Sequence, residues 1–245
     1  MTQKRSITQL LRSWPHEPGR LNARILEDDD GREVLQVRLE LGILQLETRG
    51  RPDGLRPEGA DSWFDHHRER SPSAPGGASL DPPTCALLRE EAALYAYRGM
   101  VFSVLDDLEG VLRDAERNLD LAAHVLAHAE VEADRDWARS TLRQFLMLRA
   151  RTRSTLAARS GDLPRARAAL EEGLDALEAV HAAGGAVEPF DTTPEAKVLH
   201  GMREMLVPQL PASQRQELRE RLNRALAVEN FELAAILRNE LRQLP

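Results

Sequence analysis

Residues 218–241 read LRERLNRALAVENFELAAILRNEL, and this stretch decides how the C-terminal part of the chain folds. Two sets of apolar residues recur in it at helical spacing, about 100° per residue. The first set comprises Leu218, Leu222, Ala225, Leu226 and Val228, and the second comprises Phe231, Ala234, Leu237, Leu241 and Leu244. Between them, Glu229-Asn230 suits a tight reversal of the chain. The sequence therefore predicts two amphipathic helices that fold back on each other.

The second helix is apolar over more of its circumference than one neighbouring helix covers. Leu233 and Ile236 lie beside its stripe and widen the apolar arc to roughly 220°. A hairpin of about 30 residues also buries too little surface to be stable alone. The extra arc is therefore expected to pack on the body of the chain, on a second copy or on a partner. The residues expected to form this interface are Leu218, Leu222, Leu226, Phe231, Leu233, Ile236, Leu237 and Leu241.

These residues resemble the UVR domain, the short helical hairpin of the UvrB and UvrC repair proteins, of the McsA activator and of some Clp ATPases. The resemblance implies protein–protein docking, with another UVR-containing protein or a second copy of this chain as partner. McsA-type proteins carry cysteine zinc motifs in their N-terminal half, whereas this chain has one cysteine, Cys85. The McsA role is therefore not carried over.

A second resemblance concerns the N-terminal text QVRLELGILQLETRGRPDG at residues 36–54. Joined to helices of tetratricopeptide (TPR) type and to the terminal hairpin, it resembles a family of UVR-motif proteins from planctomycete bacteria. The resemblance implies the architecture and no particular activity.

Composition places the chain in a broad class. Its 245 residues are 42% hydrophobic and only 4% aromatic, which suits a mainly helical protein. No apolar run approaches the length of a membrane span, and the first residues lack the features of a signal peptide, so we expect a cytoplasmic protein. The net charge of -7 argues against a nucleic-acid coat protein. A single cysteine excludes an intramolecular disulfide and a cysteine-rich zinc site.

The N-terminal residues have the period of β-strands. Apolar residues alternate over 21–25 and 35–41, with an Asp-Gly turn at 28–31, which predicts a β-hairpin. The alternation slips by one residue at Gly42, as a bulge or a change of strand direction would produce. Pro52-Asp53-Gly54 then predicts a turn, and we expect the loop 49–56 to rest on the first helices near Tyr95 and Tyr97.

The fold class predicted is α+β, mainly α. A β module at 1–59 is followed by a Pro/Gly/Ser-rich connector at 60–83, a TPR-like helical body at 84–207 and the UVR-like hairpin at 213–245. The body breaks at 105–107 and at 160–162, and similar text follows both breaks with an offset of 55 residues. This repeat predicts stacked helix pairs with Ala166 and Ala169 at close contacts.

Two groups of arginines are candidate contacts for an acidic partner. They are Arg49, Arg51 and Arg56 in the loop after the strands, and Arg135, Arg139 and Arg143 on one helical face. For the second group, ion pairs with the acidic helix around 106–116 are the favoured alternative. For the loop, its turn chemistry alone would also explain its Pro and Gly content, with Asp53 holding the turn.

Catalytic and metal-binding patterns are weak. His124 and His128 are one helical turn apart, and His66-His67 follow Asp65, but no third ligand has a defined position, so we favour packing histidines over a metal site. No nucleophile elbow, phosphate loop or Cys-His signature occurs. We therefore expect no catalytic residue, no metal and no cofactor, and a non-enzymatic adaptor or scaffold. The alternatives are a nucleic-acid or DNA-repair accessory that uses the hairpin and the arginine face, and an enzyme with its site at the loop 49–56.

Overall fold

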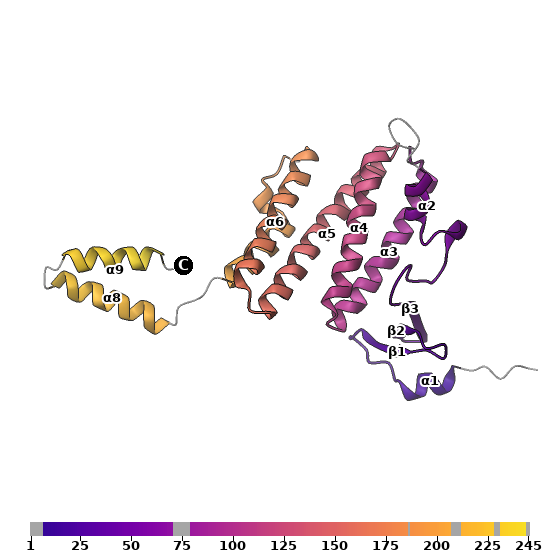
Figure 1. Ribbon diagram of the computed structural model, residues 1–245, viewed down its shortest axis with the longest axis horizontal. Helices are drawn as coiled ribbons and strands as arrows, with labels where there is room; N and C mark the ends of the chain where they lie inside the picture. The colour runs from indigo at the N-terminus through magenta and orange to yellow at the C-terminus, as the bar shows by residue number, and fades with distance from the viewer. Residues whose placement is uncertain (1–6, 71–78, 186, 207–211, 228–230, 244–245) are drawn as a thin grey trace, which may run out of the picture. The chain divides into compact units, whose positions relative to one another are not determined.

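The computed structural model describes residues 7–70, 79–185, 187–206, 212–227 and 231–243. The chain divides into two compact units, Met1–Leu199 and His200–Pro245. Figure 1 shows the mainly helical chain with its small sheet near the N-terminus, which is the α+β class that the sequence predicted.

Three antiparallel strands form the sheet, in the order β1-β2-β3. They are β1 (Asn22–Glu27), β2 (Glu33–Leu39) and β3 (Gly42–Glu47). Between β1 and β2, one carboxylate oxygen of Asp28 accepts hydrogen bonds from the backbone N–H groups of Asp30 and Arg32, and Gly31 has a φ of 75°. The predicted hairpin with an Asp-Gly turn is confirmed.

The slip in the alternation at Gly42 is a change of strand direction. Leu39 pairs with Gly42 across the two residues Glu40 and Leu41, so the chain turns back into β3. Gly42 is not among the residues with positive φ, and a Cβ added there would meet nothing within 4 Å. Of the two predicted alternatives, the change of strand direction is confirmed, and the backbone at Gly42 does not require glycine.

The sheet shares a hydrophobic core with the helices instead of forming a separate module. Leu35, Val37 and Leu46 pack in one cluster with Val101 and Phe102 of α3 (Pro82–Val104). Ahead of the sheet, a short helix α1 (Thr8–Ser13) leads to Trp14, whose ring lies 4.1 Å from the Arg24 guanidinium.

Part of the predicted connector is folded and packed. A single 3-10 turn η1 (Pro57–Gly59) precedes α2 (Trp63–Arg70), and the side chain of Phe64 is buried in the helical core. Composition gave no sign of this because only two bulky residues, Trp63 and Phe64, anchor the segment. Residues 71–78 of the predicted connector lie outside the described residues.

The body consists of helices that pack in sequence order (Figure 1). After α3 come α4 (Leu108–His128), α5 (Glu132–Arg159), α6 (Leu163–Ala183), the 3-10 turn η2 (Phe190–Thr192) and α7 (Pro194–Met205). Within the described residues, no helix has the length and apolar character needed to cross a membrane.

Both predicted breaks are confirmed, and they have the same construction. Asp107 and Asp162 cap the following helices by accepting hydrogen bonds from the N–H groups of Gly110 and Arg165. The preceding residues, Asp106 and Gly161, have φ angles of 62° and 80°. The 55-residue offset thus corresponds to two equivalent helix starts. The assignment of these pairs to the TPR type stays a prediction.

A third break, between α4 and α5, was not predicted. Ala129 and Val131 are extended there, and Leu80 pairs with Ala129 as an isolated bridge. The Leu80 N–H donates to the His128 carbonyl at 2.9 Å, and the Glu130 N–H donates to the Leu80 carbonyl at 3.0 Å. The segment contains neither Gly nor Pro, so a distant residue ends the helix where the local sequence gives no signal.

The close helix contact predicted for Ala166 and Ala169 holds only for the first of them. Ala166 is fully buried, whereas Ala169 is half-buried and lines a cavity of about 600 Å³ between α4, α5 and α6. The closest approach lies one turn further along α6. A Cβ added at Gly173 would lie 2.3 Å from the Cβ of Ala150 on α5.

The second unit contains the hairpin formed by α8 (Ala212–Ala227) and α9 (Phe231–Gln243). The two helices pack against each other (Figure 1), as the apolar stripes predicted. The reversal expected at Glu229-Asn230 falls between them, outside the described residues.

Candidate functional site

The contact between α8 and α9 is a small apolar core. Ala225 and Leu237 are buried in it, with Leu218 and Leu222 packed against them. Leu241 is half-buried, and the side chain of Phe231 lies outside the described residues. Leu237, which is 2% exposed, is therefore part of the hairpin's own interior.

Among the described side chains of the hairpin, three large apolar ones remain at the surface. Leu226 on α8 is 48% exposed, and Leu233 and Ile236 on α9 are 40% and 58% exposed. Leu233 and Ile236 are three residues apart, so they are neighbours on one face of α9. We call this pair the α9 row. These two residues are the ones that widened the predicted apolar arc of the second helix beyond what its partner helix covers.

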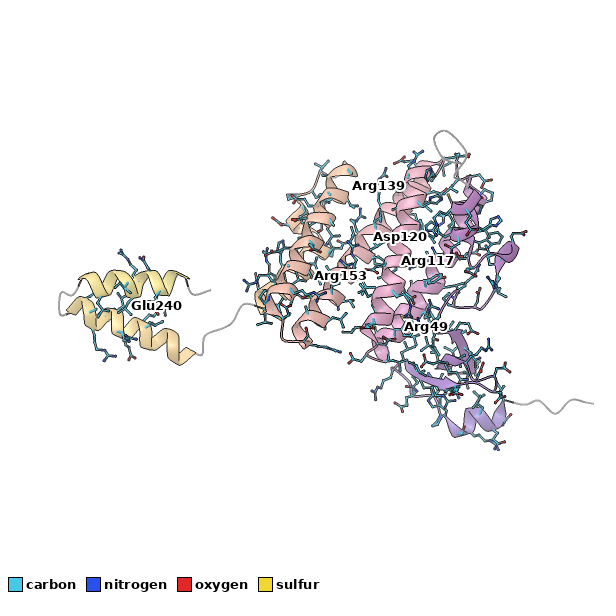
Figure 2. The ribbon with its side chains drawn as sticks, viewed as in Figure 1. Arg49, Arg117, Asp120, Arg139, Arg153 and Glu240 are labelled. Carbon is cyan, nitrogen blue, oxygen red and sulfur yellow. The ribbon has the colours of Figure 1, made fainter. Side chains whose placement is uncertain are left out.

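The hairpin also carries exposed charged residues of both signs. Arg219, Glu220, Arg224, Arg238 and Glu240 are all exposed on the hairpin, and Figure 2 shows Glu240 on α9. The exposed surface of the hairpin thus combines an apolar row with charges of both signs, a composition that suits contact with another helix.

Residues 213–244 match the family described as the UvrB/uvrC motif, UVR. The match spans both helices of the hairpin and includes Leu226 and the α9 row. The comparisons with curated proteins and with solved structures gave no match for the chain. The hairpin predicted from its apolar stripes is therefore a UVR hairpin.

The loop 49–56 lies against α3, as expected, but Arg51 is not on its surface. The Arg51 side chain is only 10% exposed, and it forms ion pairs with Asp53 at 3.0 Å and with the fully buried Glu91 at 3.4 Å. Asp53 also accepts a hydrogen bond from the Leu55 N–H at 3.0 Å, which holds the turn as predicted. Arg51 is thus a structural clamp, and its place among the partner contacts has to be withdrawn.

The other two arginines of the loop remain exposed. Arg49 is exposed beside the end of β3 (Figure 2). Arg56 forms a surface ion pair with Asp61. Of the three loop arginines, only these two are placed where a partner would reach them.

Glu91 is the centre of a buried polar network that the sequence did not reveal. Its carboxylate accepts hydrogen bonds from the backbone N–H groups of Trp63 at 2.7 Å and Phe64 at 3.3 Å, at the start of α2. Arg117 of α4 contacts Glu91 at 3.2 Å and Asp65 at 3.3 Å, and it also donates to Ser62 (Figure 2). The network therefore holds α2 and the loop 49–56 onto α3 and α4.

The predicted arginine face on α5 is largely neutralised, though not by the helix that we expected. Arg135 and Arg139 pair with Glu132 at 2.8 and 2.7 Å, and Arg139 also pairs with Asp136 at 2.5 Å. Arg143 lies 4.0 Å from Glu195 of α7. The acids that pair with Arg135 and Arg139 come from the N-terminal part of α5 itself, where carboxylates are favoured. The acidic helix α4 instead pairs with Arg153, through Glu116 at 2.7 Å (Figure 2).

The four histidines noted in the sequence meet at the contact between α2 and α4. The rings of His124 and His128 are 4.6 Å apart, and those of His66 and His67 are 5.3 Å apart. In the described part of the chain, no group of three or more His, Cys, Asp or Glu side chains is arranged to hold a metal ion. Burial, followed by the neighbouring His128, His67 and Arg68, lowers the pKa of His124 to about 4.

The sequence did carry a signal for other buried polar contacts, which lie between α3 and α4. On α4 the buried stripe runs through Val111, Asp114, Asn118, Leu121 and Val125. Two polar residues therefore occupy apolar positions of a helical repeat, where a polar side chain needs a partner. The partner of Asp114 is Arg98, and the amide of Asn118 donates to the Ala92 carbonyl at 3.0 Å.

Proposed function

We propose that this chain is a non-enzymatic adaptor that binds another protein through its C-terminal UVR hairpin. The observation that carries the proposal is the α9 row, in which Ile236 is 58% exposed while the adjacent Leu237 is buried. An exposed apolar face on a helix that already has a partner helix is typical of a protein-docking surface.

The occupant that we propose for this row is a second helical hairpin of the same motif, carried by a partner protein. The hairpin of this chain is too short to bury a stable core of its own, since chains below about 40 residues usually need oligomerisation or another staple. A second hairpin would cover the row with another pair of amphipathic helices. The exposed charged residues of the hairpin would find opposite charges on such a partner.

The two groups of arginines that the sequence offered as contacts for an acidic partner give this proposal little support. Arg135 and Arg139 are already paired within α5, and Arg51 is clamped to Glu91. The same ion pairs weaken the alternative role in nucleic-acid binding, because neutralised arginines release fewer counterions from phosphates. Exposed Arg49 and Arg56 remain proposed contacts for an acidic partner.

Three single-charge substitutions on α9 test the adaptor role. Ile236→Glu adds a charge to the α9 row, Asn239→Glu adds the same charge to an exposed polar position, and Leu237→Glu adds it to the hairpin core. Sedimentation gives the mass of each full-length variant, and capture from the native cell gives its bound proteins. The proposal predicts that Ile236→Glu loses the partner or the dimer, that Asn239→Glu keeps it and that both have wild-type helical content. Equal binding by Ile236→Glu and Asn239→Glu would contradict the proposal, whereas Leu237→Glu should lose both binding and helical content.

A further inference from the structure

The contact between α2 and the body is rich in imidazole. Of the seven histidines in the chain, His66, His67, His124 and His128 lie at this one contact. The ring of His124 also lies 5.4 Å from that of Phe64 on α2. The Nε2 atom of His124 is buried and has no hydrogen-bond partner among the described residues. A neutral imidazole tolerates this environment better than a charged one does.

Helix α2 depends on its contacts with the body. It has eight residues, fewer than an isolated helix needs to persist in water. Phe64 anchors it by entering the core cluster that includes Leu88 of α3 and Leu121 of α4. The Glu91 carboxylate accepts hydrogen bonds from the backbone N–H groups of the first two residues of α2. Loss of these contacts would free α2 and uncover the apolar cluster that Phe64 closes.

The charged groups around His124 oppose its protonation. His128 approaches from α4, and His67 and Arg68 approach from α2, all of them cationic or able to become so. The Arg117 guanidinium lies 4.4 Å from the Phe64 ring. Asp81, which caps α3, is the acidic group that faces His67. A proton on His124 would therefore meet positive neighbours and a buried apolar ring.

We propose that α2 is an acid-sensitive strap, which leaves α3 and α4 when His124 at its contact becomes protonated. This inference concerns the first unit and is independent of the function proposed for the hairpin. Through Phe64 the strap packs on the cluster that contains Leu88, Ala92, Leu121 and Val125, so its release exposes an apolar face of the body.

The direction in which pH changes the docking of α2 follows from the titration of His124. In the docked state the pKa of His124 is lowered to about 4, from an ordinary value near 6.5 that it regains when α2 leaves. The released state therefore binds more protons between these two values. Docking of α2 is fully favoured above pH 6.5 and is progressively lost as the pH falls toward 4. For a half-buried side chain, roughly a tenfold change in the docking equilibrium is expected between pH 7 and pH 5.

Amide hydrogen exchange of the full chain at pH 7 and pH 5, corrected for the intrinsic rates, tests the strap. Peptides that cover residues 63–70 should lose about tenfold in protection at pH 5, while peptides from α6 keep theirs. His124→Phe removes the titrating group and keeps an apolar ring beside Phe64, so it should hold the protection of α2 at pH 5. His16→Gln is the matched control, because His16 is half-buried ahead of β1, outside the cluster, and it should behave like the wild type.

Three results would overturn the strap. One is unchanged protection of α2 in the wild type at pH 5, and another is a parallel loss in α6, which would mean global acid unfolding. The third is an equal loss in His124→Phe and the wild type. If His124→Phe does not fold, His124→Gln replaces it, since an amide of similar size also carries no titrating group, and the same outcomes apply.

Discussion

Arg98 on α3 and Asp114 on α4 form two parallel hydrogen bonds, Nε to Oδ2 at 2.8 Å and Nη2 to Oδ1 at 2.7 Å. Both side chains are only 2% exposed. The remaining Nη1 of Arg98 donates to the carbonyls of Glu47 and Gly50 at 2.9 and 2.8 Å. One guanidinium thus joins two helices to the end of the last strand, and it fixes the loop 49–56 on the helical body.

Removal of one partner of this pair should destabilise the first unit strongly. Arg98→Met leaves the Asp114 carboxylate buried without its counter-charge, which costs about 3–5 kcal/mol in the free energy of unfolding. Arg113→Ala is the control, because exposed Arg113 donates one bond to the Thr48 carbonyl, and it should cost about 1 kcal/mol. Urea unfolding followed by circular dichroism measures both. The double variant Arg98→Met/Asp114→Leu should recover much of the loss, and a wild-type midpoint for Arg98→Met alone would refute the clamp.

The two arginines at either side of Gly50 should behave differently when truncated. Arg51→Ala removes the ion pairs to Asp53 and Glu91 and should lower the unfolding free energy by about 1–3 kcal/mol. Arg49→Ala changes an exposed side chain and should stay within about 0.5 kcal/mol of the wild type. Thermal melts of the two variants provide the comparison. Equal melting temperatures would return Arg51 to the surface role that the sequence predicted.

Close packing of α5 and α6 should make Gly173 intolerant of a side chain. The Cβ of Gly173→Ala would collide with Ala150, so we expect a loss of about 1–3 kcal/mol from overpacking. Ala169→Leu adds a larger side chain that points to the cavity of about 600 Å³, and it should be nearly neutral. Denaturant midpoints separate the two. The reverse order of stability would show that the helices cross at Ala169 instead.

The single thiol should be inert in the folded chain. Cys85 is buried, and burial together with the neighbouring Asp134 raises its pKa to about 11. At pH 8 only about one thiol in a thousand is then ionised. A disulfide reagent such as dithionitrobenzoate should therefore label Cys85 slowly in buffer and rapidly in urea. Fast labelling of the folded chain at pH 8 would show that the start of α3 is packed less tightly than the structure describes.

Local patterns in the sequence were enough to predict the elements that local chemistry decides. The Asp-Gly turn before β2, the Asp107 and Asp162 caps and the two stripes of the hairpin all follow from residue type and spacing. The close contact at Gly173 was assigned to Ala169, because periodicity gives the face of a helix but not the depth at which two helices cross.

The rest depends on contacts between distant residues. The break before α5 is formed with Leu80, nearly 50 positions earlier in the chain. Arg51 looked like a surface arginine because its partner Glu91 belongs to another element, 40 positions away. Charge pairs of this kind become visible in a sequence only through polar residues at apolar positions, as with Asp114 and Asn118 on α4.

Docking through the α9 row is tested most directly by a photo-crosslinking amino acid placed at Ile236 of the full chain in its native cell. Mass spectrometry then identifies the residues to which position 236 is joined, and the same probe at exposed Asn239 measures background. Our account predicts crosslinks from position 236 to a helical hairpin of another molecule, and few from position 239. Crosslinks from position 236 only to residues of the same chain would contradict it.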